Sequence, residues 1–251
     1  MTAETAATSR RAVRPVLYLV RHGQTDWNLE PARCQGRADV PLNERGREQA
    51  RELGRRLAGR GIELVVTSHL ARARETAELV RDELERTAGP PREAPTSPDA
   101  SIVAGDELAP SGARPSPPRI QLRIDERLAE TDRGEWEARV FADIVREDAE
   151  TWRAYREHPE TFTFPGGESL AAQQRRVLEA LRDAALTRRV ALLVTHGGSI
   201  RLVRAFLEGR GIEAFHEMKV PDGEVLEVDD RGLVRRIDAF LDPPGYPPGT
   251  G

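Results

Sequence analysis

Four short runs of apolar residues predict the strands of a sheet. Val16–Val20, Leu64–Thr67 and Ala191–Val194 are apolar or nearly so and rich in β-branched residues, which is typical of parallel strands covered on both faces. Glu224–Val228 instead alternates apolar and polar residues, and the turn sequence Asp-Asp-Arg-Gly separates it from Leu233–Phe240. This last pattern predicts an antiparallel hairpin at one edge of the sheet.

Segments of helical period lie between these runs. Leu70–Ala88 carries apolar residues at intervals of three and four, the spacing of an amphipathic helix. Glu44–Gly59 and Glu168–Leu186 repeat this spacing, and Phe141–Glu157 and Ser199–Glu208 are further candidate helices. Because strands and helices alternate, we predict an α/β fold, a three-layer α/β/α sandwich with a mostly parallel central sheet.

The chain has 251 residues, which suffices for one medium-sized domain with a substantial core. No internal repeat or domain boundary is evident, so we expect a single domain over residues 15–241. Residues 1–14, which are polar, and 242–251, which are rich in Pro and Gly, are expected to be flexible tails. A Pro-rich stretch at about 89–119 lacks periodicity and predicts a long insertion.

Composition argues against several classes of protein. The 38 Lys and Arg residues against 42 Asp and Glu give a net charge of −4, without the basic excess of a nucleic-acid binder. No apolar stretch approaches the roughly 20 residues of a membrane helix, and the N-terminus lacks the apolar core of a secretion signal. The single cysteine, Cys34, cannot form an internal disulfide. We therefore expect a cytoplasmic protein that binds neither nucleic acid nor membranes.

Two of the five histidines directly follow predicted strands. His22 comes after the first strand and Arg21 and precedes Gly23, whereas His196 comes after the third strand and precedes Gly197. The carboxyl ends of parallel strands meet at one edge of a sheet, where ligands bind in open α/β folds. The glycines let a backbone approach a ligand and open a helix whose N-terminus favours anions. We therefore expect both histidines at one crevice.

Arg21 and Arg72 are expected to point into the same crevice. Arg72 follows the strand Leu64–Thr67, one turn into the next helix. The planar guanidinium offers a fork of donors that matches phosphate oxygens. Each His-Gly pair could be only a turn, and Arg72 only a surface charge, but together the four groups favour a site for a dianion. The other three histidines are expected to be structural or surface residues; they are His69, His158 and His216.

Several blocks of this sequence resemble the histidine phosphatase superfamily, which includes the cofactor-dependent phosphoglycerate mutases. All blocks occur in the family's order between about residues 16 and 228. They are Leu19–Asn28, Gln35–Gly36, Asp39–Asn43, Gly46, Thr67–Ala77, Leu128–Glu130, Gly134–Glu137, Pro165–Ser169 and Val194–Gly198. The resemblance implies a phosphoglycerate mutase-like fold.

The resemblance also implies a catalytic set of five residues. His22 would attack phosphorus and become a phosphohistidine, while Arg21, Arg72 and His196 would stabilise the charge on the phosphate oxygens. Glu130 would protonate the leaving alcohol and then activate water. No metal or other cofactor is implied, because the arginines already neutralise the phosphate.

The family's substrate pocket corresponds here to Gly23, Asn28, Gln35, Gly36 and Gly197, although Asn28 could instead cap a turn.

Two departures from the family's pattern follow Glu130. Arg133 stands where the family often has an aromatic residue, and Ala138 stands where it usually has glycine. Either could alter the loop that holds Glu130. Glu126 and Glu135 are nearby alternatives for the acid.

We expect a metal-independent phosphomonoesterase that hydrolyses a small phosphorylated metabolite through a phosphohistidine. The alternative within the family is a phosphoglycerate mutase, which needs extra basic groups and a closing lid. Residues 89–119, where a lid could arise, carry few cations, and the segments at 35–36 and 165–169 resemble the phosphatase branch.

Two further functions receive less support from the sequence. A catalytically inactive binding module would be free to lose its reactive residues, and all five are present. A metallohydrolase with His22 and His196 as ligands is disfavoured because Arg21 and Arg72 would repel a cation. The sequence leaves open whether the protein forms a homodimer.

Overall fold

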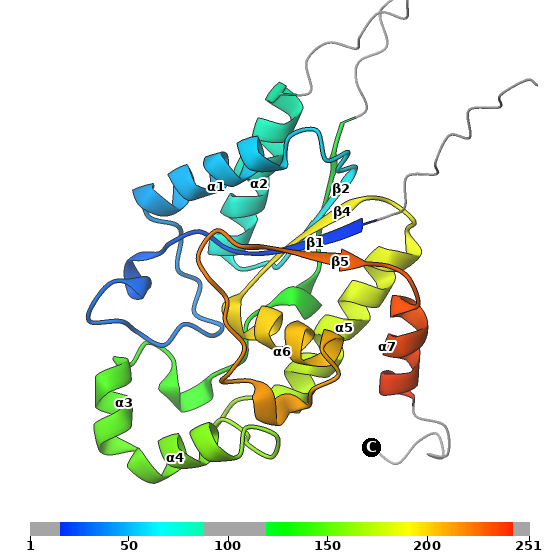
Figure 1. Ribbon diagram of the computed structural model, residues 1–251. Coiled ribbons are helices and arrows are strands. Elements are labelled where there is room, and N and C mark those ends of the chain that lie inside the picture. The colour runs from blue at the N-terminus through cyan, green and yellow to red at the C-terminus, as the bar shows by residue number, and fades with distance from the viewer. Residues whose placement is uncertain (1–15, 88–118, 243–251) are drawn as a thin grey trace, which may run out of the picture.

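A five-stranded sheet forms the centre of the computed structural model, which describes residues 16–87 and 119–242 (Figure 1). The strand order is β3-β2-β4-β1-β5, and every neighbouring pair is parallel except β1 with β5. The strands are β1 (Val16–Arg21), β2 (Leu64–Thr67), β3 (Gln121–Ile124), β4 (Ala191–Thr195) and β5 (Val225–Asp229). The two predicted tails and nearly all of the predicted insertion at 89–119 lie outside the described residues.

Helices cover both faces of this sheet. On one face lie α1 (Glu44–Leu57) and α2 (Ala71–Thr87), and on the other α5 (Leu170–Leu186), α6 (Gly197–Leu207) and α7 (Leu233–Leu241) (Figure 1). The predicted three-layer sandwich with a mostly parallel sheet is therefore confirmed. None of the helices in the described part of the chain is both long and apolar enough to cross a membrane.

The two halves of the core follow from the alternation of side chains along each strand. In β1, Leu17 and Leu19 point to the face covered by α5, α6 and α7, whereas Tyr18 and Val20 point to the face covered by α1 and α2. Both sets are buried. Burial on both faces explains why the central strands are largely apolar up to their last residues, Arg21, Thr67 and Thr195.

A third buried cluster lies beside the sheet, under α3 (Phe141–Glu147) and α4 (Ala149–Glu157). It is largely aromatic, and we call it the aromatic cluster; its rings belong to Trp136, Trp152, Tyr155, Phe162, Phe164 and Phe215. Tyr155 lies near its middle, with ring centroids 5.3 Å from those of both Phe162 and Phe164. Figure 1 places α3 and α4 away from the two helical layers.

The predicted edge hairpin is only half correct. β5 is the antiparallel edge strand, but Leu233–Phe240 is not its partner strand and instead belongs to helix α7. Leu233 and Ile237, four residues apart, are buried against the core below the sheet. This spacing is helical rather than alternating, so burial of one helix face decided the structure.

Two other elements differ from the prediction. The edge strand β3 was not predicted, because its four residues QLRI show no apolar run and none of them is fully buried. The single helix predicted over Phe141–Glu157 is two helices that meet at Asp148. There the carboxylate of Asp148 accepts a hydrogen bond from Nε1 of Trp136 at 3.1 Å and also contacts Arg139.

Candidate active site

His22 and His196 lie side by side at the carboxyl ends of β1 and β4. The two strands pair in parallel with Arg21 opposite Thr195, and the backbone N–H of His22 donates to the carbonyl of Thr195 at 3.0 Å. The imidazole centroids are 5.2 Å apart. The predicted meeting of the two histidines is therefore found. An α-helix follows only His196, since His22 leads into a loop with one short 3-10 turn.

The imidazole of His22 is held in one tautomer. Its Nδ1 lies 2.7 Å from the carbonyl oxygen of Gly23, and because a carbonyl only accepts, Nδ1 carries the proton. Nε2 then has a lone pair. Burial, followed by the charges of Arg72 and Arg21, lowers the pKa of His22 well below its usual 6.5. His22 is thus a neutral, oriented imidazole whose Nε2 lone pair is available.

His196 is completely buried, and neither of its ring nitrogens has a hydrogen-bond partner among the residues described. Burial, and then the charge of Arg72 and the proximity of His22, lower the pKa of His196 well below 6.5. Buried polar atoms are normally paired. An imidazole at the N-terminus of α6 with two free nitrogens therefore has hydrogen-bonding capacity left for a ligand.

The two predicted arginines differ in their surroundings. Arg21 lines the cavity beside His22, and its Nη1 is 2.9 Å from Oδ1 of the exposed Asp222. Arg72 is fully buried and does not line this cavity. It donates from Nη1 to the carbonyl of Ala38 and from Nη2 to that of Gly36, both at 2.8 Å. Burial lowers the pKa of Arg72 to about 10, and its Nε has no partner within the described ranges.

Glu130 is buried and held as a carboxylate. Its Oε1 accepts from the backbone N–H of Thr131 at 2.9 Å and from Nε2 of Gln173 at 3.0 Å, and its Oε2 accepts from the N–H of Gly198 at 3.0 Å. Burial alone would raise its pKa, but Arg133 and these hydrogen bonds lower it. A Cβ at position 198 would lie 2.4 Å from Oε1, so glycine is required for this approach.

The two alternative acids lie outside the cavity. Glu126 and Glu135 are exposed, and the cavity lining contains neither. Within the described part of the chain, Glu130 is the one carboxylate in that lining.

The structure separates the five predicted substrate-binding residues into two groups. Asn28, Gln35 and Gly197 line the cavity, which has a volume of about 300 Å³. Gly23 borders a smaller adjoining hollow that it shares with Arg21 and His22. Gly36 lines neither, and its carbonyl serves to hold Arg72. Asn28 also has the predicted turn role, because its Oδ1 accepts from the backbone N–H of Thr25 at 2.9 Å.

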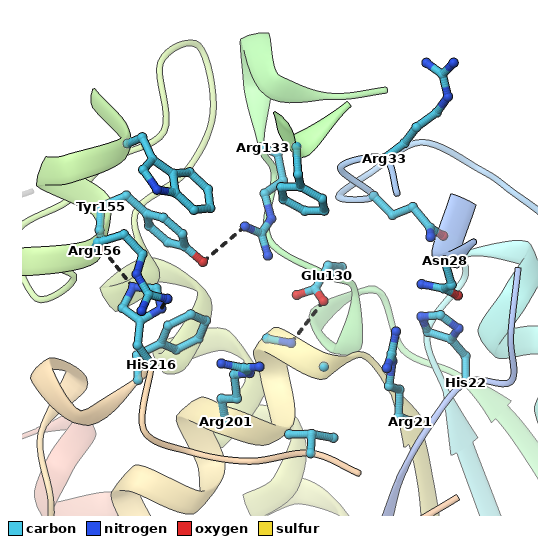
Figure 2. A pocket seen from close by; sticks show the side chains of 17 residues that line it. Arg21, His22, Asn28, Arg33, Glu130, Arg133, Tyr155, Arg156, Arg201 and His216 are labelled. Carbon is cyan, nitrogen blue, oxygen red and sulfur yellow. Dashed lines mark hydrogen bonds between the residues drawn. The ribbon is translucent and has the colours of Figure 1, made fainter. Parts of the chain in front are cut away.

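The cavity contains cations that sequence reasoning did not predict (Figure 2). They are Arg33, Arg133, Arg156 and Arg201, together with His216. These residues come from separate loops and helices and share no motif. The prediction that His216 is structural or at the surface was therefore incomplete. One signal was present for Arg201, since it follows Gly197 by four residues and so lies one helical turn along the same face.

Ala138 lies in a conformation that explains the family's glycine at this position. Its φ is 64°, in the left-handed region that is unfavourable for residues with a Cβ. Its N–H donates to the carbonyl of Cys34 at 3.0 Å, which fixes the turn beyond Glu137. The other departure, Arg133, places a guanidinium in the cavity.

Comparison with known proteins adds four similarities. The family model described as histidine phosphatase superfamily (branch 1) matches residues 17–93 and 112–240. A protein named "Probable phosphoglycerate mutase GpmB" from Erwinia tasmaniensis is 30% identical over 217 residues, which cover 85% of this chain and 84% of that protein.

Among solved structures, a mycobacterial glucosyl-3-phosphoglycerate phosphatase is similar with a TM-score of 0.65 and 25% identity, over 85% of this chain and 90% of its own. An α-ribazole phosphatase from Shigella flexneri is similar with a TM-score of 0.63 and 28% identity, again over 85% and 90% of the two chains.

Proposed function

Because the chain belongs to branch 1 of the histidine phosphatase superfamily, we propose that it hydrolyses phosphomonoesters through a phosphohistidine at His22. The observation that carries this proposal is that His22 and Glu130 line one cavity, the first as a neutral imidazole and the second as a carboxylate. A nucleophile and a group able to move protons therefore face the same bound substrate.

In the first step, Nε2 of His22 forms a bond to phosphorus while the bond from phosphorus to the ester oxygen breaks. Glu130 gives its proton to the leaving oxygen. Because Glu130 is ionised in the free site, this proton has to arrive with a monoanionic phosphate, or after the bound phosphate has raised the pKa of the carboxyl group. Arg21, the N–H of Gly197 at the start of α6, and His196 stabilise the charge on the phosphoryl oxygens.

In the second step, a water molecule attacks phosphorus and the bond to His22 breaks. Glu130, now a carboxylate, accepts the proton of this water. Inorganic phosphate leaves, and His22 returns to its neutral form with Nδ1 still donating to Gly23.

The proposed reaction uses arginines rather than a metal ion to neutralise the phosphate. Over residues 16–87 and 119–242, no group of three or more His, Cys, Asp or Glu side chains is placed to hold a metal. The charges of Arg21 and Arg72 beside the histidines disfavour a cation and favour an anion at this position.

A phosphoglycerate mutase is the second candidate. Two observations favour it: the name of the relative from Erwinia tasmaniensis, and the four additional arginines in the cavity. Residues 89–119 carry few cations, which disfavoured a mutase in the sequence. The additional arginines of the cavity come from other segments; they are Arg33, Arg133, Arg156 and Arg201. We place the phosphatase first because the two compared structures carry phosphatase names.

The test is release of inorganic phosphate from p-nitrophenyl phosphate and 3-phosphoglycerate in excess chelator. The wild type is expected to release phosphate and to carry an acid-labile phosphoryl group when quenched during turnover. His22→Ala is expected to lose both. His158→Ala is the matched control, because His158 is exposed and outside the cavity, and it should behave as wild type.

A coupled assay separates the two candidates. Formation of 2-phosphoglycerate from 3-phosphoglycerate, primed with bisphosphoglycerate and faster than phosphate release, would replace the phosphatase by the mutase. Activity that survives in His22→Ala, or that disappears with the chelator, would overturn the phosphohistidine mechanism itself.

A further inference from the structure

One end of the cavity carries more positive charge than the proposed phosphoryl transfer uses, since only Arg133 of its arginines is needed to keep Glu130 ionised. Arg133, Arg156 and Arg201 line it, and Figure 2 shows Arg156 and His216 across the cavity from His22, with Arg201 between the two sides. Within the described ranges, none of these three arginines forms an ion pair with a carboxylate. Glu130 offsets part of the charge of Arg133, and among the described residues of the cavity lining this end still has an excess of positive charge.

Tyr155 organises two of the three arginines. Its hydroxyl accepts from Nη1 of Arg133 at 3.4 Å, and its carbonyl accepts from Nε2 of His216 at 2.8 Å. Because Nε2 of His216 is the donor, Nδ1 is left to accept from Nη1 of Arg156, 3.0 Å away. Tyr155 is buried in the aromatic cluster, so this arrangement rests on a packed base.

Among these arginines, Arg201 has the surroundings that most favour binding of an anion. It is only partly exposed, and its guanidinium has neither a hydrogen bond nor an ion pair with any residue of the described ranges. Its Cζ lies 5.6 Å from the ring centroid of Phe215, and burial lowers its pKa. A partly buried charge without a partner is unfavourable until an anion binds to it.

The geometry points to a second anion subsite formed by Arg133, Arg156 and Arg201. We propose that it binds a carboxylate or a second phosphate of the substrate while the phosphomonoester group lies at His22. This inference rests on the proposed phosphatase function and names its substrate class, which is a small phosphomonoester with a second anionic group. The volume of about 300 Å³ fits a compact substrate of this kind.

Matched substrates test the subsite. 3-Phosphoglycerate and glycerol 3-phosphate share a skeleton and differ in a carboxylate against a hydroxymethyl group, and propane-1,3-diol bisphosphate tests a second phosphate. For the wild type we expect kcat/KM to be about 10- to 100-fold higher for 3-phosphoglycerate, for propane-1,3-diol bisphosphate or for both than for glycerol 3-phosphate, as charged hydrogen bonds allow. The difference should lie mainly in KM. Equal kcat/KM for all three compounds would overturn the proposal.

Substitutions locate the effect. Arg201→Met and Arg156→Met are expected to lower kcat/KM for 3-phosphoglycerate much more than for glycerol 3-phosphate and so to remove the preference for the second anion, because only the carboxylate makes a charged contact there. Arg153→Met is the control, since Arg153 is exposed on the same helix as Arg156 but outside the cavity. If Arg201→Met and Arg156→Met both keep the preference, as the Arg153→Met control should, the subsite does not exist.

His216 tests how Arg156 is held. His216→Leu removes the acceptor for Arg156, and it should raise KM for 3-phosphoglycerate without a matching rise for glycerol 3-phosphate. His216→Gln offers an acceptor oxygen and should recover part of the lost affinity. A general loss with both substrates that His216→Gln does not relieve would show that His216 serves only the fold.

Calorimetry separates failure of the subsite from failure of the phosphatase proposal. His22→Ala should still bind 3-phosphoglycerate, and His22→Ala combined with Arg201→Met should bind it about 10-fold or more weakly. If no compound is hydrolysed but this difference in binding is found, the subsite stands and the phosphatase function falls. If compounds are hydrolysed but the difference is absent, the subsite falls alone.

Discussion

His22 and Glu130 line one cavity, and arginines lie near both of them. Burial and two arginines keep the imidazole neutral, whereas Arg133 and three donated hydrogen bonds keep the carboxyl group ionised. Both pKa values are therefore lowered, which leaves each group deprotonated: the imidazole is neutral and the carboxyl group is negatively charged. The same direction of shift thus gives the two side chains different charges because their chemical types differ.

The role of Glu130 can be isolated with p-nitrophenyl phosphate, because p-nitrophenolate leaves without needing a proton. In Glu130→Gln, transfer of the phosphoryl group to His22 should therefore persist, while attack by water should slow by about 10²- to 10⁴-fold, the usual contribution of a general base. Stopped-flow measurement is expected to show a burst of about one equivalent of p-nitrophenolate, as covalent catalysis with slow turnover of the intermediate requires.

Glu126→Gln provides the comparison, because Glu126 is exposed and outside the cavity. It should show wild-type turnover. A slow first turnover in Glu130→Gln, without a burst, would mean that Glu130 is needed before the phosphohistidine forms.

Individual residues also show what a sequence can predict about a site. His22, His196 and Arg21 follow strands of a parallel sheet, so their convergence follows from the fold. Arg156 reaches the cavity through the packing of α4, which leaves no local pattern, whereas Arg201 lies one helical turn after Gly197 on α6. Arg72 fits its predicted position in the chain, yet its contacts with two backbone carbonyls could not be derived without the loop that supplies them.

Helix α5 holds the loop that carries Glu130. Nη1 of Arg176 donates to the carbonyls of Arg127 at 2.8 Å and Ala129 at 2.6 Å, and its Nη2 donates to the carbonyl of Glu130 at 3.0 Å. Its Nε also donates to Glu168 at 3.0 Å. One side chain of the helix thereby holds three backbone carbonyls within residues 127–130, next to the carboxylate of Glu130.

Arg176→Met should leave these carbonyls without partners and lower the free energy of unfolding by about 2 to 4 kcal/mol, with a fall in kcat because the loop at Glu130 is no longer fixed. Arg175→Met tests the adjacent position. Arg175 is exposed and makes only a surface pair with Glu179 at 3.6 Å, so its loss should cost less than about 0.5 kcal/mol. Denaturant titrations of both variants, with kcat measured on the same samples, give the comparison. Equal losses would remove the special role of Arg176.

Among whole elements, the success of prediction depended on periodicity. The long helices α1, α2 and α5 and the central strands bury regular stripes or continuous runs, and their predicted ranges are close to those observed. Strand β3 has too little burial to produce a pattern, and α7 is short enough for its nine residues to be mistaken for a strand. The sequence did not predict the left-handed backbone of Ala138, although the family's glycine at this position indicated an unusual conformation there.

Across the whole molecule, the buried histidines couple stability to pH. His22 and His196 have pKa values well below 6.5 in the folded protein, so below pH 6.5 the unfolded chain binds protons that the folded protein does not. The free energy of unfolding therefore decreases as pH falls through the unfolded pKa toward the folded one. The slope of the free energy of unfolding against pH approaches about 1.4 kcal/mol per pH unit for each histidine that stays neutral in the folded protein.

His22→Gln tests this coupling, because glutamine is polar but does not titrate. Denaturant titrations between pH 6.5 and 5.0 should give a pH slope for the variant that is smaller by about 1.4 kcal/mol per pH unit, whatever its absolute stability. His158→Gln, at an exposed histidine, serves as the control and should keep the wild-type slope. An unchanged slope in His22→Gln would show that His22 is protonated in the folded protein.

The pair formed by Arg21 and Asp222 gives the site a carboxylate of its own. With Nη1 of Arg21 2.9 Å from Oδ1 of Asp222, an incoming phosphate has to compete with a tethered anion for this nitrogen. The same carboxylate is available to take Arg21 back when inorganic phosphate leaves. Asp222 is 69% exposed, so it can turn away and return at little cost. Competition between Asp222 and phosphate for Arg21 lowers the affinity for inorganic phosphate as well as for the substrate. It therefore favours rapid product release over tight binding.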